Sequence, residues 1–415
     1  MFNSLFLNEL ISKIDTRKSR TEGTSGNKNF EIDQRQIDWY GLPDIMDTLA
    51  FLEERMPKGS IKIQWLKFGI QKTGVKKFSI KKEYIDDLYS LANRKSPHEY
   101  LRDAKEKILY QKNICRTPWL IAYYDERLNK IERRGTLPAD WNDNLLDKYL
   151  NAVAENTEPI HERMFSLKLG TGIQELTSKT FNTYKGRVCT VIKKYCPDIR
   201  TTDNISDNDI LRQFNILTSN LYMEFKGALT YSIGSRTFST EGHETGCVWN
   251  METIRKVVIT AMPNCKRVVC IENKANFVMQ AYDPETLYIY VHGYLSPAER
   301  NICRQIETLC PQAEYYHWSD MDYGGICIFN YMKDKVFHKV EPLHMSASDY
   351  IKCHTLGLSG YKITKSTLEK LKKMDAGPLK DLKEEILRYG RGYEQEELLT
   401  VNHPTHYFGN GWGLK

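Results

Sequence analysis

The feature that most constrains the fold is a series of short apolar runs alternating with helical patterns over residues 265–345. The runs CKRVVCIE, TLYIYVHG and AEYYHW are rich in β-branched and aromatic residues, and VFHKVEPLHM follows as a fourth. Between them lie GGICIFNYMKDK and SPAERNICRQIETLC, and the latter has Ser296, Pro297 and Glu299 at positions typical of a helix start. This alternation predicts a parallel sheet with right-handed crossovers.

Acidic residues stand where two of these runs end. Glu272 closes the first run, and Asp320 and Asp322 follow the third. Because the carboxyl ends of parallel strands share one rim of a sheet, we expect the three carboxylates to converge there. They would repel one another without a counter-charge, and Mg²⁺ or Mn²⁺ suits such an all-oxygen set. For the aspartate pair alone, a polar turn that opens a helix is an equally good interpretation.

Other residues near this rim have several possible roles. Lys274 could offset charge on a phosphate, although a surface lysine beside a strand is the commoner case. His292 is a candidate proton carrier, but single histidines more often have structural roles. Gly293 would leave the rim open to an ion or phosphate. In GYEQEEL, Glu394 or Glu396 could reach the rim from a C-terminal helix, whereas a solvated helical face is the usual place for such a charge run.

A lysine-rich stretch, residues 58–82, marks the N-terminal half. It contains eight lysines, no acidic residue and alternating apolar residues, which predicts two strands with QKTGVKK as the turn. The lysine face could follow a phosphate backbone, or it could protect a sheet edge from aggregation. Upstream, residues 17–30 are poor in apolar side chains and predict a flexible linker. Helical patterns occupy residues 1–15, 43–56 and 96–113, the last with a capping box formed by Ser96 and Glu99.

Composition excludes several classes of protein. The net charge of +6 is mildly basic and compatible with a nucleic-acid partner. No apolar run is long enough to span a membrane, and the N-terminus lacks the pattern of a signal peptide. The ten cysteines include no Cys-x-x-Cys pair, which argues against a disulfide scaffold and against zinc. We therefore expect reduced thiols in a cytoplasmic protein.

The motifs VVCIENKANF, YYHWSDMDYGGICIFNY and YEQEEL are similar to those of a known family. They resemble the nuclease subunits of Wadjet plasmid-defence systems, the JetD family, which are Toprim-domain proteins related to the A subunit of type IIB topoisomerases. The similarity covers residues 256–400, with Ser319 where the family commonly has glycine.

The resemblance implies a multidomain α/β architecture. It implies a mostly helical N-terminal arm with lysine-rich strands over residues 1–100. It further implies a winged-helix-like DNA-binding domain over residues 101–255. The last part, residues 256–415, would be a Toprim catalytic domain with a parallel sheet flanked by helices.

The resemblance also implies a homodimer that makes metal-dependent cuts in double-stranded plasmid DNA alongside an SMC-type motor complex. Glu272, Asp320 and Asp322 would then bind Mg²⁺ or Mn²⁺ and act in catalysis. Lys274 is a further candidate catalytic residue, and Glu396 a further metal ligand. Two other functions remain possible: a topoisomerase-like transesterase with a tyrosine nucleophile, or a non-catalytic DNA-binding adaptor.

Overall fold

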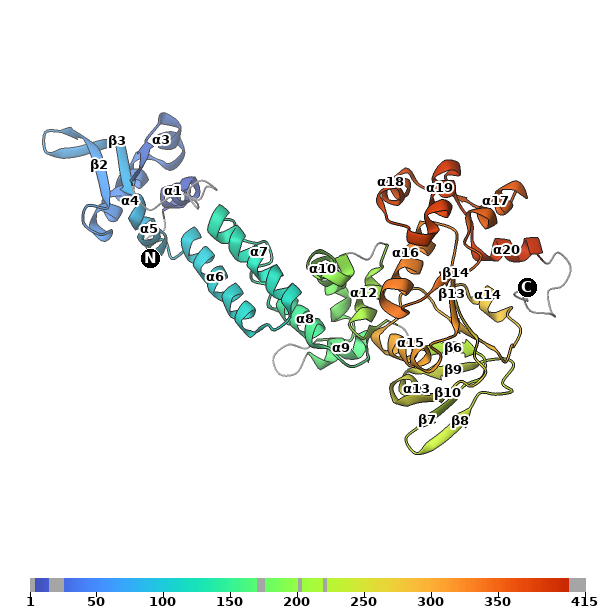
Figure 1. Ribbon diagram of the computed structural model, residues 1–415. Helices are drawn as coiled ribbons and strands as arrows, with labels where there is room; N and C mark the ends of the chain where they lie inside the picture. The colour runs from blue at the N-terminus through green and yellow to red at the C-terminus, as the bar shows by residue number, and fades with distance from the viewer. Residues whose placement is uncertain (1–3, 15–25, 170–175, 201–203, 219–221, 403–415) are drawn as a thin grey trace. The chain divides into compact units, whose positions relative to one another are not determined.

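The parallel strands expected in the C-terminal part are present in the computed structural model, which has a mixed α/β fold (Figure 1). The structure describes residues 4–14, 26–169, 176–200, 204–218 and 222–402. The chain divides into two units, Met1–Asp147 and Lys148–Lys415. Among the described residues, no helix is both long enough and apolar enough to cross a membrane.

The first unit contains a three-stranded antiparallel sheet. Its order is β1-β3-β2, formed by β1 (Asn27–Glu31), β3 (Gln71–Lys81) and β2 (Ile61–Phe68). The lysine-rich stretch therefore forms two strands, as predicted. The linker prediction for residues 17–30 is wrong for its last part, because β1 pairs with the end of β3. Residues 17–25 lie outside the described residues.

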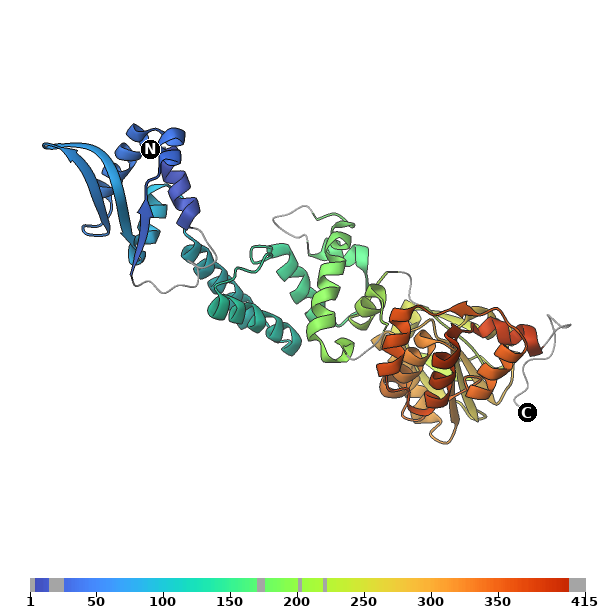
Figure 2. The same ribbon diagram turned by 90° about the horizontal axis from the view of Figure 1, so that it is seen from above.

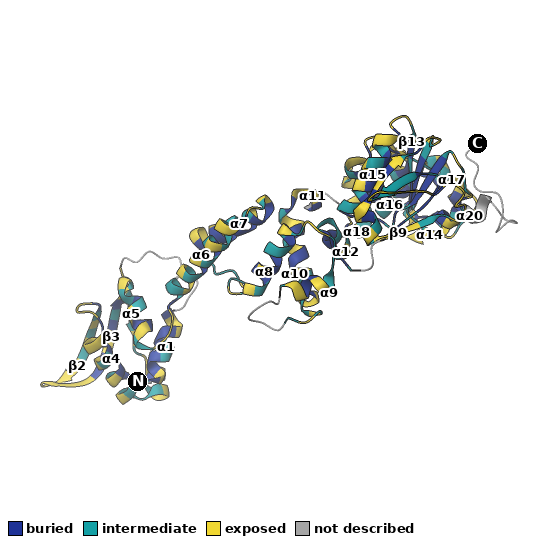
Figure 3. Cartoon of the chain, turned by 90° about the horizontal axis from the view of Figure 1, so that it is seen from below, coloured by how far each residue is buried: buried dark blue, intermediate teal, exposed yellow. Residues whose placement is uncertain are grey.

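The turn between β2 and β3 lies at Gly69 and Ile70, so its predicted position in QKTGVKK is wrong. Gly69 has a φ of 64°, as expected for glycine at the first position of a two-residue hairpin loop. The apolar Ile70 hid this turn from sequence analysis, because loops usually carry polar residues there. Figure 2 shows β2 and β3 extending together as a curved two-stranded ribbon, and Figure 3 shows its outer part exposed.

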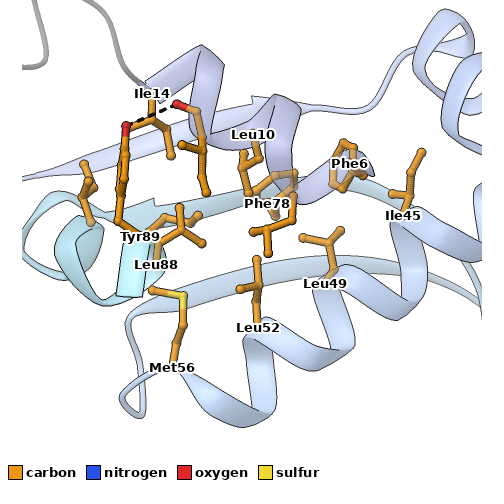
Figure 4. Packing of buried hydrophobic residues seen from close by; sticks show 14 of the residues in the cluster. Phe6, Leu10, Ile14, Ile45, Leu49, Leu52, Met56, Phe78, Leu88 and Tyr89 are labelled. Atoms are coloured by element: carbon orange, nitrogen blue, oxygen red, sulfur yellow. Dashed lines mark hydrogen bonds between the residues drawn. The ribbon is translucent and has the colours of Figure 1, made fainter. Parts of the chain in front are cut away.

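Helices cover one face of this sheet and supply its core (Figure 4). The helices of the unit are α1 (Leu5–Ile14), α3 (Gln34–Tyr40), α4 (Leu42–Arg55), α5 (Ile85–Leu91), α6 (Pro97–Ile114) and α7 (Pro118–Arg134). The buried side chains include Phe6, Leu10, Ile14, Leu49, Leu52, Phe78 and Leu88. Ser96 and Glu99 form the predicted capping box at the start of α6. The base of the ribbon is thus anchored by apolar burial.

The second unit begins with helices. They are α8 (Asn144–Glu155), whose first residues belong to the first unit, α9 (Glu162–Lys168), α10 (Thr180–Tyr195), α11 (Pro197–Arg200) and α12 (Asp207–Gln213). Two short parallel strands, β4 (Ile160–His161) and β5 (Ile216–Leu217), join them. Arg212 and Gln213 of α12 donate to the carbonyl oxygens of Tyr294 and Leu295. These bonds fix the helical region against the sheet that follows.

That sheet has six strands in the order β14-β13-β11-β12-β6-β9. The first four are parallel: β14 (Glu341–Pro342), β13 (Glu314–Trp318), β11 (Arg267–Ile271) and β12 (Thr286–Tyr290). The other two are β6 (Tyr222–Lys226), which pairs antiparallel with β12, and β9 (Cys247–Asn250), which pairs antiparallel with β6. A separate sheet contains β10 (Val257–Ala261), β7 (Thr230–Ile233) and β8 (Arg236–Ser239). The chain runs from β11 to β12 on one side of β11 and then crosses to β13 on the other. This is the switch in strand order where α/β sheets place their sites.

The remaining elements surround the parallel strands. The helices are α13 (Met251–Lys256), α14 (Lys274–Val278), α15 (Pro297–Leu309), α16 (Tyr323–Tyr331), α17 (Ala347–Thr355), α18 (Lys365–Lys373), α19 (Lys380–Tyr389) and α20 (Gln395–Asn402). A short hairpin pairs β15 (Tyr361–Lys362) with β16 (Arg391–Gly392). All ten cysteines lie within the described residues and are thiols that form no disulfide there, as predicted.

Candidate active site

The parallel pairing of β11 and β13 brings the first two acidic residues together. Ile271 is in register with Trp318, so the residues that follow each strand emerge side by side. The backbone N–H of Glu272 donates to the carbonyl oxygen of Trp318 at 3.0 Å. The backbone N–H of Asp320 also acts on the Glu272 carboxylate and lowers its pKa. Glu272 and Asp320 are therefore neighbours at the carboxyl rim of the sheet.

Their environment disfavours negative charge. Burial raises the pKa of Glu272 to about 8, and the charges of Asp320 and Asp322 add to the shift. Burial likewise raises the pKa of Asp320 to about 7, with contributions from Asp322, Glu396 and Glu394. Within the described part of the chain, Oε2 of Glu272 is buried and has no hydrogen-bond partner. A buried acceptor of this kind is costly unless a proton or a cation satisfies it.

Asp322 has two hydrogen-bond donors of its own. It caps α16 by accepting from the backbone N–H of Gly325 at 2.7 Å. The hydroxyl of Tyr361, on β15, donates to its other oxygen, and burial beside these carboxylates raises the pKa of Tyr361. A Cβ at position 325 would lie 1.9 Å from the carbonyl oxygen of Asp320. Only glycine fits there, and the helix-opening interpretation is confirmed for Asp322.

The C-terminal segment reaches the same rim. Met321 and Tyr393 form an antiparallel bridge in which the N–H of Met321 donates to Tyr393 at 2.9 Å. This bridge lays the YEQEEL segment beside the aspartate pair. The charges of Glu394 and Glu396 consequently act on Asp320. Glu396 also accepts a hydrogen bond from the side chain of Asn273.

Gln395 connects the ends of both strands. It is 1% exposed, and its backbone N–H donates to Oδ1 of Asp320 at 2.8 Å. Its side-chain amide donates to the carbonyl oxygen of Trp318 at 2.9 Å and accepts from the backbone N–H of Asn273 at 2.8 Å. Gln395 therefore holds the segments that carry Glu272 and Asp320 in one arrangement.

The acidic residues at this rim form one group, called the acidic cluster below: Glu272, Asp320, Asp322, Glu394 and Glu396. Two other candidate residues have partners outside this acidic cluster. Lys274 forms an ion pair with Glu224 of β6, and its ammonium group lies 5.0 Å from the ring centre of Tyr290. His292 lies between Arg212, at 2.8 Å, and Glu299, at 3.0 Å. These contacts give His292 a structural role.

Gly293 has a φ of 101°, and among the described residues other than its chain neighbours no atom lies within 4 Å of where a Cβ would be. That part of the rim is open, as expected.

Sequence analysis missed three residues of the site. Gln395 lies between Glu394 and Glu396, which were considered as candidates because of their charge. An uncharged residue within a charge run has no sequence pattern that would indicate a role in the site. Asn273 directly follows Glu272, where it reads as an ordinary helix cap. Tyr361 had no sequence signal, because only the pairing of β15 with β16 brings it to Asp322.

The acidic cluster meets one requirement of a divalent-ion site and lacks another. Within the described ranges, no three His, Cys, Asp or Glu side chains are already arranged to hold a metal. The donors are all oxygens, however, and one carboxylate oxygen is buried without a partner. Hard cations such as Mg²⁺ prefer this donor chemistry. The residues therefore fit such an ion chemically, provided that the Asp322 oxygens exchange their present donors for it.

Comparison with known proteins gives two matches. Residues 239–404 match the family described as Wadjet protein JetD, C-terminal. The chain is also similar to Wadjet protein JetD of Bacillus cereus (strain Q1), with 22% identity over 414 residues. That alignment covers 96% of this chain and 98% of the relative. Together, the two matches show that this chain is similar to JetD over nearly its whole length, and to the JetD family model over its C-terminal part.

Proposed function

We propose that this protein is a metal-dependent DNA endonuclease that acts in Wadjet anti-plasmid defence. The observation that supports this most is the pairing of Glu272 with Asp320 at the switch point of the sheet. Asp322 and Glu396 add further negative charge there. Such a cluster lowers stability near neutral pH, and a bound divalent cation would reverse that cost.

Glu272, Asp320 and Asp322 would hold Mg²⁺ or Mn²⁺, with Glu396 as a further carboxylate. A bound ion would supply Lewis acidity for phosphodiester hydrolysis. Gln395 would keep Asp320 in place through its backbone N–H. Lys274 could approach a phosphate only after its ion pair with Glu224 opens.

The similarity to JetD over nearly the whole chain supports a wider proposal about architecture and partners. Residues 256–415 would be the Toprim catalytic domain, and residues 101–255 a winged-helix-like DNA-binding domain. The protein would act as a homodimer in the cytoplasm on double-stranded plasmid DNA, together with an SMC-type motor complex.

Plasmid cleavage tests the endonuclease proposal. Supercoiled plasmid is incubated with the protein and its Wadjet partners, in Mg²⁺, in Mn²⁺ and in EDTA. We expect nicked or linear product only with a divalent ion, and none from the Asp320→Ala, Asp322→Ala double variant. Glu314→Gln is the matched control, because Glu314 lies at the opposite end of β13. A double variant that cuts as well as its parent would show the proposal to be wrong.

A thermal melt distinguishes the enzyme from a non-catalytic adaptor. An ion that binds only the folded state adds about 3 kcal/mol to the free energy of unfolding when its concentration is roughly one hundred times its Kd. The melting midpoint rises as a result. We expect Mg²⁺ or Mn²⁺ to stabilise the wild type but not Asp320→Asn. No shift in the wild type would favour the adaptor.

A topoisomerase-like transesterase is a second candidate, because the Tyr361 hydroxyl lies against Asp322. The raised pKa of Tyr361 opposes it, since the phenol stays protonated and donates to a carboxylate instead of attacking a phosphate. A covalent adduct between protein and DNA, trapped under denaturing conditions and lost in Tyr361→Phe, would support the transesterase. Free DNA ends would support the nuclease.

A further inference from the structure

The β2–β3 hairpin has an apolar tip that contributes nothing visible to the fold. Phe68 is 81% exposed, Ile70 is 98% exposed and Leu66 is 50% exposed. Ile70 occupies a loop position where hairpins favour polar residues. These residues lie beyond the part of the sheet that pairs with β1, whose apolar face is covered by helices. Large exposed apolar groups gathered in one place usually mark a contact surface.

Lysines line the ribbon from its base to this tip. Lys62, Lys67, Lys76 and Lys77 are exposed, and among the described residues none of them has a recorded ion pair. Lys67 lies directly across from Lys72 in the β-ladder. Like charges in opposed positions repel each other, and the ion pair between Lys72 and Glu53 offsets this repulsion only in part. An anionic partner would reverse the cost.

Edge protection accounts for only part of this charge. Lys62 and Lys67 lie on the edge strand β2, and Lys76 lies beyond the last pair with β1, where β3 is an edge as well. Lys77, by contrast, lies on β3 between its two neighbouring strands. Lys72 has a different role from the four unpaired lysines. It pairs with Glu53 at 3.1 Å, and its ammonium group lies 4.0 Å from the Trp65 ring centre. Lys72 thus braces the ribbon.

The ribbon is also bent by its own sequence. The register of β2 and β3 shifts twice, between Gln64 and Trp65 and between Leu66 and Lys67. Such irregularities increase strand twist and bend the ribbon. A curved, lysine-flanked, two-stranded ribbon with an apolar end has the dimensions and chemistry to follow a DNA groove.

We propose that the β2–β3 hairpin is a DNA-bending wedge. Its lysines contact phosphates on either side of a groove, and Phe68 and Ile70 insert between neighbouring base pairs. Apolar side chains at such a position partly unstack a base step and kink the duplex. The inference rests on the proposed action on DNA and adds how the first unit would hold and deform it.

The test separates binding from bending and is carried out in EDTA, so that cleavage plays no part. The full-length protein binds a duplex of about 30 base pairs that carries a fluorophore at each end and 2-aminopurine within. Anisotropy reports binding, energy transfer between the ends reports bending, and 2-aminopurine fluorescence reports unstacking. The variants are Phe68→Ser, Ile70→Ser for the tip and Lys67→Gln, Lys76→Gln, Lys77→Gln for the charges.

We expect the tip variant to bind within about threefold of the wild type but to lose bending and unstacking. The lysine variant should lose about tenfold or more in affinity, and the slope of log K against log salt should fall by about 2 to 3. Trp39→Ser is the matched control, because Trp39 is 79% exposed on α3 of the same unit. It should leave all three signals unchanged. Circular dichroism should show every variant folded, because the altered side chains are exposed.

A tip variant that bends and unstacks DNA as well as the wild type would overturn the proposal. Loss of binding to anionic vesicles in the tip variant, with DNA bending unchanged, would also overturn it and assign the tip to a membrane surface. The plasmid assay stays independent. If the wild type bends DNA but does not cut plasmid, the endonuclease proposal is wrong and the wedge proposal stands. If it cuts plasmid but does not bend DNA, the wedge proposal is wrong and the endonuclease proposal stands.

Discussion

Replacing Glu272 with glutamine should stabilise the metal-free protein at alkaline pH. The Glu272 carboxylate is buried beside Asp320 and Asp322, and one of its oxygens has no hydrogen-bond partner among the described residues. Glutamine keeps the shape of the side chain and carries no charge. The variant therefore removes the repulsion that a bound divalent ion would otherwise offset.

The pKa of Glu272 sets the size of the effect. Its pKa rises from 4.5 to about 8 on folding, so the folded protein binds the proton more tightly than the unfolded chain does. The resulting stability is fully present below the unfolded pKa and is lost as the pH rises through the folded pKa. From about pH 6.5 to about pH 8.5, this one group should cost about 2 kcal/mol of unfolding free energy. Glu272→Gln should not show that loss.

Urea unfolding in EDTA at the two pH values measures the difference, with the fluorescence of the buried Trp249 and Trp318 as the signal. Asp320, whose pKa is about 7, also titrates in this range and interacts with Glu272, so the difference between wild type and variant reports on the acidic pair. Groups remote from the pair, such as the cysteines, act equally on both proteins and cancel in the comparison. Glu314→Gln is the control, because this exposed glutamate is at the far end of β13. Parallel pH profiles for wild type and Glu272→Gln would refute the reasoning, since Glu272 would then be ordinarily solvated.

Four further predictions concern other residues of the second unit. Tyr361→Phe removes the hydroxyl that donates to Asp322, so a metal ion no longer competes with that donor. Mn²⁺ should therefore bind about 2- to 10-fold more tightly, as measured by calorimetry. Weaker binding would contradict this prediction. Gly325→Ala places a Cβ 1.9 Å from a carbonyl oxygen and should destabilise by about 3 kcal/mol or more. Gly293→Ala meets open space, so its cost should come only from backbone strain at a φ of 101°, about 1 to 3 kcal/mol. Thermal melts of both glycine variants measure these costs. Burial lowers the pKa of His317 from 6.5 to about 3; the wild type should therefore lose about 2 kcal/mol at about pH 5 relative to neutral pH, and His317→Leu should not.

The elements of the second unit that could be predicted are those that a local sequence pattern identifies by itself. The strands β11 and β12 are buried on both faces, so their sequences are nearly continuous apolar runs. In β13, one face is buried and the other is partly exposed at Glu314 and Tyr316, but its aromatic residues still indicate a strand. The helix α15 has a capping box at its start. The antiparallel strands β6 and β9 were not predicted, because their membership in the sheet depends on pairing across the chain and not on local pattern. The hairpin turn was misplaced because glycine stands beside an apolar residue in a position that usually carries a polar one.

The site divides in the same way. Glu272, Asp320 and Asp322 were found because parallel topology brings the ends of β11 and β13 together, and that rule requires only the order of the strands. Gln395 and Tyr361 act through contacts that span 75 and 39 residues, and no rule of spacing anticipates them. The charged groups that do the proposed chemistry can thus be inferred from sequence, because their repulsion needs an explanation. The neutral groups that hold these acids in place show no such repulsion in the sequence. Only the structure therefore reveals Gln395 as the residue that positions Asp320.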